Sequence, residues 1–247
     1  MQKNKFFSRL VNFYEGKINE IMILSAVMKT TNSHLIYNNF LRDTDPDRLK
    51  KIISRYELFR HILDIKGDIC ECGVFKGSGF FTWVKLMKIF KPNSDSKVIG
   101  FDFFETNRSI NFKFKKDKEV FNDHKDNFIS QKELKNKCLN WGFKNIALHA
   151  GNIADTSKVY MTQNIGGRIS LLYLDVDNYE GTMAVLKNLY PILTKGGVVA
   201  FDNYYNHNHG EHVAVDEFFK DKKVNIKSFP WDNSSMAYFI KNNEQKS

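Results

Sequence analysis

The chain has 247 residues, of which 42% are hydrophobic and 22 are phenylalanine, enough for one α/β domain of ordinary size. A domain of this size does not depend on disulfides for its stability, and no apolar run reaches the length of a membrane span. The formal net charge of +9 favours anionic partners, whether nucleic acid, a nucleotide-bearing substrate or an acidic surface, without choosing among them.

Residues 1–44 carry amphipathic helical signals and are predicted to form a helical extension. Three roles stay open for it: a lid, a subunit contact in a homo-oligomer, or a helix that packs on the sheet. A helix start at Asp45-Pro46-Asp47 begins the main domain, residues 45–247. The expected apolar face of that helix consists of Leu49, Ile52, Ile53, Tyr56, Phe59 and Leu63.

The first predicted strand, residues 68–71, runs into a glycine loop with the spacing E-x-G-x-x-x-G and then into a helix over 80–90. Glycines let the backbone approach a ligand closely, and the helix N-terminus behind them faces it, as in nucleotide-binding loops. The spacing matches neither the NAD fingerprint nor a P-loop, and a plain tight turn is the alternative. Cys70 and Cys72 share one face of this strand, where buried packing is favoured over a metal site.

The second predicted strand, residues 97–102, ends in Asp102, where doubly wound sheets typically place an acid that binds ribose hydroxyls. Residues 103–128 are a long polar connection in which aromatic and basic side chains alternate. They could grip a phosphate or stack a base, but a solvated loop is the favoured interpretation. A capping box at Ser130–Glu133 opens the next helix, and a third strand over 145–149 follows.

Two apolar runs, residues 169–174 and 198–201, end in Asp175 and Asp202 and flank a segment with helical spacing. That helix is expected to stop at Gly196-Gly197, which gives a right-handed βαβ unit. Parallel strands end on the same edge of a sheet, so the two acids should lie side by side, and Asn203 adds a third oxygen. Such hard oxygen ligands suit Mg²⁺. For the nearby Asp177 and Asn178, helix capping is an equally good account.

After Asn203 the chain enters a loop with His207 and His209, which are candidates for the substrate side. An exposed pair without a role is an equal alternative. A helix from His212 to residue 219 follows. Residues 224–229 and 236–240 are expected to form two closing strands, a hairpin at the sheet edge. The pattern predicts a doubly wound, Rossmann-like α/β sheet of seven strands.

Four blocks carry a closer resemblance: GDICECGVFKG, VIGFDFFE, LLYLDVDNYEGTMAVLKNLYPILTKGGVVAFDNYY and GEHVAVDEFF. In this order they resemble the signature blocks of the macrocin O-methyltransferase family, over residues 65–220. Those enzymes have the class I S-adenosylmethionine (SAM) methyltransferase fold and methylate sugar hydroxyls using SAM and Mg²⁺. The resemblance implies an O-methyltransferase acting on a nucleotide-activated sugar, a deoxyhexose or heptose, for a surface polysaccharide or a glycosylated metabolite.

Carried over by position, the resemblance implies roles for individual residues. The metal would be held by Asp175, Asp202 and Asn203, and the proton acceptor would be Asp175, His207 or His209. The implied SAM-binding residues are Glu71, Gly73, Val74, Phe75, Gly77, Ser78, Asp102, Phe103, Gly151 and Asn152. The chain departs from the family pattern, which often reads LDGDLYxST and DDY, at Val176, Asn178, Gly181 and Asn203.

Three other functions account for part of the pattern. A metal-dependent glycosyltransferase would use Asp175-Val176-Asp177 as its D-x-D motif but leaves the glycine loop unexplained. A nucleic-acid methyltransferase suits the charge, yet the fourth strand does not end in the Asn/Asp-Pro-Pro-aromatic motif of base N-methylators. A basic binding module leaves the strand-end acids unexplained. We therefore expect a small-molecule substrate, no nucleic-acid or membrane partner, and, given the odd cysteine count, a cytoplasmic enzyme.

Overall fold

A computed structural model describes residues 32–208, 210–232 and 234–242, and divides the chain after Leu49 into two compact units. In the first unit, residues 32–43 are helical. Residues 1–31, which hold most of the predicted helical extension, lie outside the described residues. The domain boundary at residue 45 therefore stays a prediction. Among the described helices, none is both long and apolar enough to cross a membrane.

The second unit is built on a six-stranded sheet with the order β3-β2-β1-β4-β5-β6. The strands are β1 (Asp68–Cys72), β2 (Val98–Asp102), β3 (Ile146–Ala150), β4 (Ile169–Leu174), β5 (Leu193–Phe201) and β6 (Ala237–Ile240). The first five are parallel, and β6 runs antiparallel to β5. From β1 the chain moves outward to β3 and then returns to β4 on the other side of β1. Doubly wound sheets bind their ligands at this reversal of strand order, at the carboxyl ends of the strands.

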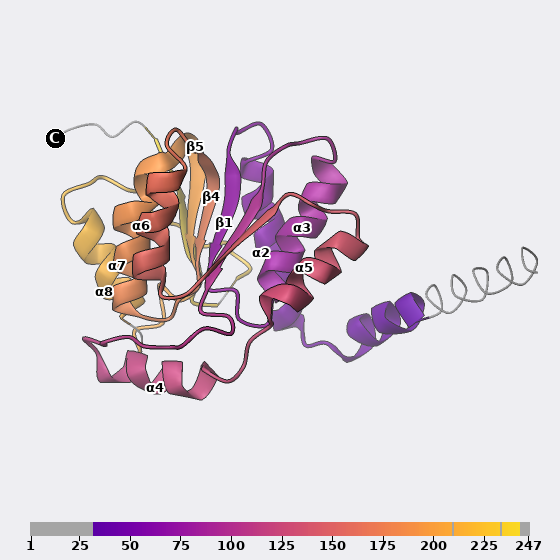
Figure 1. The fold of residues 1–247 in the computed structure, drawn as a ribbon, viewed down its shortest axis with the longest axis horizontal. Coiled ribbons are helices and arrows are strands. Elements are labelled where there is room, and N and C mark those ends of the chain that lie inside the picture. The colour runs from indigo at the N-terminus through magenta and orange to yellow at the C-terminus, as the bar shows by residue number, and fades with distance from the viewer. Residues whose placement is uncertain (1–31, 209, 233, 243–247) are drawn as a thin grey trace, which may run out of the picture. The chain divides into compact units, whose positions relative to one another are not determined.

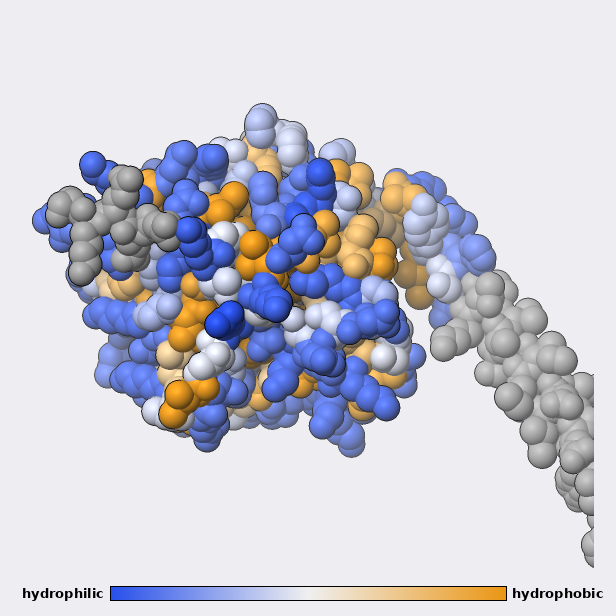
Figure 2. All heavy atoms as spheres, turned by 90° about the horizontal axis from the view of Figure 1, so that it is seen from above, coloured by the Kyte–Doolittle hydropathy of each residue, from blue (hydrophilic) through white to orange (hydrophobic). Residues whose placement is uncertain are grey.

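Helices cover both faces of the sheet (Figure 1). One face carries α2 (Pro46–His61), α3 (Ser78–Phe90) and α5 (Gln131–Asn140), and the other carries α6 (Ile153–Gln163), α7 (Tyr179–Asn188) and α8 (Glu211–Phe219). Each layer has its own buried apolar cluster against the sheet. Cys70 and Cys72 are fully buried in the cluster under α6, α7 and α8, which confirms their predicted packing role. Hydrophilic side chains dominate the surface seen in Figure 2, with smaller apolar patches between them.

The unit between Asp175 and Asp202 differs from its prediction in one detail. Helix α7 ends at Asn188, a short 3₁₀ turn (Tyr190–Ile192) follows, and β5 already begins at Leu193. The expected helix stop at Gly196-Gly197 is wrong, because both glycines lie inside β5. Their backbone groups pair with Lys241 just beyond β6, Gly196 N with Lys241 O at 2.7 Å and Lys241 N with Gly197 O at 2.8 Å. The partner strand, distant in sequence, thus extends β5 through the glycines.

The predicted closing hairpin is present in reduced form. Its second strand is β6, while residues 224–229 contribute a single antiparallel bridge between Lys227 and Tyr238. Two hydrogen bonds of 2.8 Å join these backbones. The described residues therefore hold six strands, with the expected seventh shortened to one bridge at the sheet edge.

Two helices overturn sequence predictions. Residues 115–124, expected to be a solvated loop, form α4 (Lys115–His124), whose Asp117 is buried. In α2 the buried residues are Ser54, Arg55, Leu58 and Phe59, whereas Leu49, Ile52 and Ile53 of the expected apolar face are exposed. In both helices, buried polar side chains lie on the face that packs against the protein, and apolar periodicity alone does not predict that face.

The loops after β1 and β4 touch at Gly73. Its backbone has a φ of +91°, and an added Cβ would lie 1.8 Å from the carbonyl oxygen of Asp175. A side chain there would be strained and would also push the two loops apart, so this contact holds the glycine loop against the strand that carries Asp175.

We expect Gly73→Ala to lower the free energy of unfolding by about 3 kcal/mol or more, because it adds a backbone clash to left-handed strain. Gly166→Ala is the matched control: its φ is +83°, but nothing lies within 4 Å of the added Cβ. Strain alone should make that variant less stable by about 1 kcal/mol. Urea unfolding of both proteins measures the difference, and equal losses would contradict the close approach.

Candidate functional site

The carboxyl ends of β4 and β5 bring two acids together. Leu174 and Phe201 are register partners at the ends of these strands, and Asp175 and Asp202 follow them directly. The backbone N–H of Asp202 donates to the carbonyl oxygen of Leu174 at 2.9 Å. The predicted juxtaposition of the strand ends is confirmed, while the role of the two acids as metal ligands stays a prediction.

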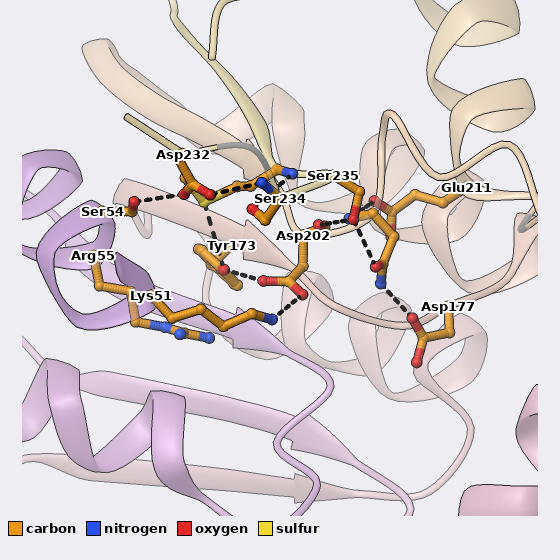
Figure 3. Close-up of polar contacts among 12 residues, drawn as sticks. Lys51, Ser54, Arg55, Tyr173, Asp177, Asp202, Glu211, Asp232, Ser234 and Ser235 are labelled. Carbon is orange, nitrogen blue, oxygen red and sulfur yellow. Dashed lines mark hydrogen bonds and ion pairs between the residues drawn. The ribbon is translucent and has the colours of Figure 1, made fainter. Parts of the chain in front are cut away.

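Both oxygens of the buried Asp202 carboxylate have a donor (Figure 3). Lys51 Nζ lies 2.8 Å from Oδ2, and the Tyr173 hydroxyl donates to Oδ1 at 2.5 Å. Burial acts to raise the pKa of Asp202, but the positive charges of Lys51 and Arg55 outweigh it, so the pKa lies below its usual value. Asp202 is therefore held in its ionised form.

Asp175 has the opposite tendency. Burial, the adjacent Asp202 and then Asp177 hold the pKa of its carboxyl well above its usual value, against the attraction of Lys51 and Arg55. Two carboxylates this close repel each other unless a proton or a cation lies between them. The strand ends thus form a pair in which one acid is ionised and the other readily accepts a proton.

The positively charged side chains at this edge come from α2, and the sequence alone does not connect this helix with the site. Figure 3 shows Lys51, Ser54 and Arg55 on one side of the helix, facing the strand ends. Ser54 Oγ donates to Asp232 Oδ2 at 2.6 Å, and the Arg55 guanidinium lies 4.7 Å from the Tyr173 ring centroid. The sequence signal was the i, i+3, i+4 spacing of these three polar residues, which places them on one face of the helix.

Asn203 joins the loop after β5 to the loop after β4. Its amide nitrogen Nδ2 donates to Asp177 Oδ1, and its oxygen Oδ1 accepts from Ser235 Oγ at 3.2 Å. Asp177 has a φ of 54°, in the left-handed region, which Asp and Asn adopt more readily than other residues with side chains. Asn178 is the N-cap of α7, accepting from Gly181 N at 2.7 Å. Capping is therefore confirmed for Asn178, whereas Asp177 points toward Asn203.

The glycine loop is fixed by Asp102. Its Oδ2 accepts from the backbone N–H groups of Val74 at 2.7 Å and Phe75 at 2.8 Å, and Oδ1 from Phe104 N at 3.3 Å. Gly77, with a φ of +86°, is the N-cap of α3, so the first helical residue is Ser78. The acid at the end of β2 therefore shapes the loop, and its predicted contact with a ribose stays a prediction.

Glu71 lies under this loop and is only 1% exposed. A Cβ on Gly79 would come within 2.0 Å of its Oε1, and Arg55 Nη2 lies 3.8 Å from the same oxygen. Its Oε2 is buried without a hydrogen-bond partner among the described residues. Burial raises the pKa of Glu71 to about 8, against the attraction of Arg55. Glu71 thus supports α3 from below, and its predicted cofactor contact is untested.

The remaining predicted cofactor residues follow β2 and β3 at the same edge. Phe103 is largely buried next to Asp102. Gly151 N donates to Asp102 O at 2.9 Å, and Asn152 caps α6 by accepting from Ala154 N at 3.0 Å. The structure thus gathers the predicted cofactor residues at the carboxyl ends of β1, β2 and β3.

The structure describes one of the two predicted histidines and places a different histidine near Asp177. His207 is exposed and lies 4.7 Å from His212, ring to ring, while His209 is outside the described residues. Another histidine, His124 of α4, has its Nδ1 3.9 Å from Asp177 Oδ2. Its ring lies 5.4 Å from that of Phe75 in the glycine loop. This contact was not predicted, because residues 115–124 were expected to be a loop.

No cluster of three or more His, Cys, Asp or Glu side chains within residues 32–208, 210–232 and 234–242 is arranged to hold a metal ion. The predicted set has two carboxylates and one amide oxygen. In the structure the Asp202 oxygens contact Lys51 and Tyr173, and the Asn203 oxygen contacts Ser235.

Comparison with known proteins gives a family match and structural neighbours. The family model described as macrocin-O-methyltransferase (TylF) matches residues 47–240. A search of curated protein sequences finds no significant match.

Three solved structures illustrate the similarity of fold. The apo structure of CalS11, a TDP-rhamnose 3'-O-methyltransferase, is 26% identical with a TM-score of 0.65, covering 83% of this chain and 85% of that one. The O-methyltransferase NovP is 22% identical with a TM-score of 0.64, covering 80% of each chain. An O-methyltransferase from Bacillus cereus, in complex with SAH, is 12% identical with a TM-score of 0.52, covering 88% and 91%. These similarities confirm the predicted class I methyltransferase fold.

We expect Glu71→Gln to change how stability depends on pH. The folded-state pKa of about 8 exceeds the ordinary value of 4.5, so the wild type takes up a proton on folding between these values. Its stabilising contribution is complete below the ordinary pKa and is lost as the pH rises through the folded pKa. The free energy of unfolding of the wild type should therefore fall relative to Glu71→Gln between about pH 5 and about pH 9. Urea unfolding measures this, and a difference independent of pH would show an unshifted Glu71.

Proposed function

The chain belongs to the macrocin O-methyltransferase family, and we propose on this basis that it transfers a methyl group from SAM to a hydroxyl of a nucleotide-activated sugar. The observation that carries the proposal is the pairing of Asp175 and Asp202 at neighbouring strand ends, on the edge that also bears the glycine loop. CalS11, a TDP-rhamnose 3'-O-methyltransferase, supports the substrate class. In more detail, we propose that the sugar is a deoxyhexose or heptose that is used for a surface polysaccharide or a glycosylated metabolite. The enzyme is proposed to act in the cytoplasm.

SAM binding is proposed for the edge formed by β1, β2 and β3. The loop backbone is already ordered by Asp102, so little ordering is left for the cofactor to induce. Gly73 and Gly77 supply the positive φ values, 91° and 86°, that shape the loop, and the N-terminus of α3 adds N–H groups without a partner inside the helix. The other proposed cofactor contacts are Phe103, which follows β2, and Gly151 and Asn152, which follow β3.

Mg²⁺ is proposed to bind Asp175, Asp202 and the Asn203 oxygen. The donor types fit a hard cation, and a cation would relieve the repulsion that raises the pKa of Asp175. Binding would require Lys51 to leave Oδ2 of Asp202, whereas the Asn203 oxygen has a second lone pair and could keep its hydrogen bond from Ser235. When bound, the ion would lower the pKa of the sugar hydroxyl and fix its position.

The chemistry at the chain's own residues is simple. The hydroxyl oxygen forms a bond to the methyl carbon, the carbon–sulfur bond of SAM breaks, and S-adenosylhomocysteine (SAH) leaves with the electron pair. The hydroxyl proton needs an acceptor, for which we propose Asp175, a carboxylate at the strand end where the hydroxyl would be held. His207 and His209 stay the alternatives, on the loop that follows Asn203.

We expect the purified protein with Mg²⁺ and SAM to add one methyl group to a nucleotide sugar from a panel that includes TDP-rhamnose, detected by mass spectrometry. Asp175→Asn should lower the rate at least about tenfold, because Asp175 is both a proposed metal ligand and the proposed proton acceptor. The exposed Asp95→Asn, before β2, is the charge-matched control and should keep full activity.

Each rival outcome is distinct. Full activity in excess EDTA would overturn the metal proposal alone. Labelled methyl in RNA or DNA, with none in any sugar nucleotide, would indicate a nucleic-acid enzyme. Sugar transfer without methyl transfer would favour the glycosyltransferase.

We expect Asp102→Ala to weaken SAH binding about tenfold or more, because the N–H groups of Val74 and Phe75 lose their acceptor. Asp68→Ala is the matched control, since Asp68 Oδ1 accepts from Lys97 N at 2.8 Å at the opposite end of β1. The control should lose stability but retain its SAH affinity in calorimetry. Equal affinity in both variants would exclude Asp102 from cofactor binding.

A further inference from the structure

One buried acid that is not among the predicted site residues holds two helix N-termini together. Asp117 of α4 is 1% exposed. Its Oδ2 accepts from the backbone N–H of Tyr179, the first residue of α7, at 2.9 Å. Its Oδ1 accepts from the backbone N–H of Gly210, the N-cap of α8, at 2.7 Å. Unpaired N–H groups and the helix dipole make both positions favourable for a carboxylate, so one side chain serves two helices.

The packing around this carboxylate is tight. A Cβ on Gly210 would lie 2.5 Å from Asp117 Oδ2, 2.8 Å from Phe114 Cδ2 and 2.8 Å from Tyr179 Cβ. Gly210 has a φ of −72°, so its backbone conformation does not demand glycine. Glycine is needed there because of the close approach of α4.

Both helix N-termini lead back to Asn203. Tyr179 comes two residues after Asp177, whose Oδ1 accepts from Asn203 Nδ2. Gly210 precedes Glu211, whose Oε1 accepts from Asn203 N at 2.9 Å. The links form a closed ring that runs from Asp117 through α7 to Asn203 and back through α8. Figure 3 shows the Asp177 and Glu211 side chains, whose hydrogen bonds with Asn203 close the ring.

From this ring we infer that Asp117 is a positioning residue for methyl transfer: it sets the relative position of the loops that carry Asp177 and Asn203. The inference rests on the proposed function, in which Asn203 contributes to metal binding. Figure 1 shows α4 apart from both helical layers, along the end of the sheet. The same tether holds His124, at the end of α4, beside Asp177.

The test variant is Asp117→Asn, which keeps the size of the side chain but replaces one acceptor oxygen with an amide that faces an N–H donor. Asp123→Asn, an exposed position on the same helix, is the matched control for charge. Mn²⁺ is the metal probe, followed by electron paramagnetic resonance. We expect Asp117→Asn to weaken Mn²⁺ binding about tenfold. SAH affinity, measured by calorimetry, should not change, because the glycine loop is held by Asp102.

Hydrogen exchange tests the inference without metal or acceptor. In Asp117→Asn the amides of Tyr179, Gly210 and Asn203 should exchange faster than in the control, while those of Val74 and Phe75 do not change. Unchanged exchange at Asn203 would overturn the inference and leave Asp117 as an anchor of α4 only.

If Asp117→Asn does not fold, Gly210→Ala applies the same displacement from the opposite side and is judged by the same exchange rates. If the wild type binds no Mn²⁺, the metal part of the proposed function fails, and exchange at Asn203 still decides the role of Asp117.

Discussion

The structure depends on the neutralisation of buried acids at one edge of the sheet. Parallel strands that end in register deliver Asp175 and Asp202 to the same place, and burial makes their mutual repulsion severe. Lys51 and Arg55 of α2 supply the positive charges that compensate it. The attraction of Asp202 and Asp175 raises the pKa of Lys51, although burial alone would lower it. The sheet and its first covering helix are thus coupled by charge as well as by apolar packing.

The opposite half of this edge is organised without cations. Asp102 meets backbone N–H groups instead, and the Asp102 carboxylate is therefore compensated by the loop that it shapes. One half of the edge holds a loop backbone fixed by hydrogen bonds to a carboxylate, and the other holds side chains joined by an ion pair. This division suits a reaction in which the methyl donor is held still while the acceptor is activated.

Much of this arrangement was predictable from the sequence, because it follows from local patterns. The strand-end acids, the glycine loop, the Asn178 alternative as a cap and the two buried cysteines are all set by residues within a few positions of one another. The doubly wound sheet followed from the βαβ pattern, and the expected seventh strand, reduced to one bridge, shows that short edge segments carry too few signals. The individual roles of the predicted site residues remain predictions.

The parts that the sequence did not predict depend on contacts across the chain. Ser54 is buried in α2 because Asp232 lies opposite it, 178 residues away. Helix α4 has few apolar residues, and its buried Asp117 gains partners only where α7 and α8 begin. Gly196 lies in a strand because Lys241 pairs with it. In each case a distant partner outweighs the local propensity.

The position of Lys51 bears on how this part of the fold can be exchanged between relatives. Helix α2 precedes the first strand, so by topology it looks like a dispensable leader to the sheet. It nevertheless supplies the charge that lets the ends of β4 and β5 coexist, more than a hundred residues later in the chain. A chimera that joined a foreign N-terminal region at the start of β1 would keep every strand and every strand-end acid. It would also contain the two neighbouring carboxylates without their counter-ions, so the part of the chain that must be transferred together begins before Lys51 rather than at the sheet.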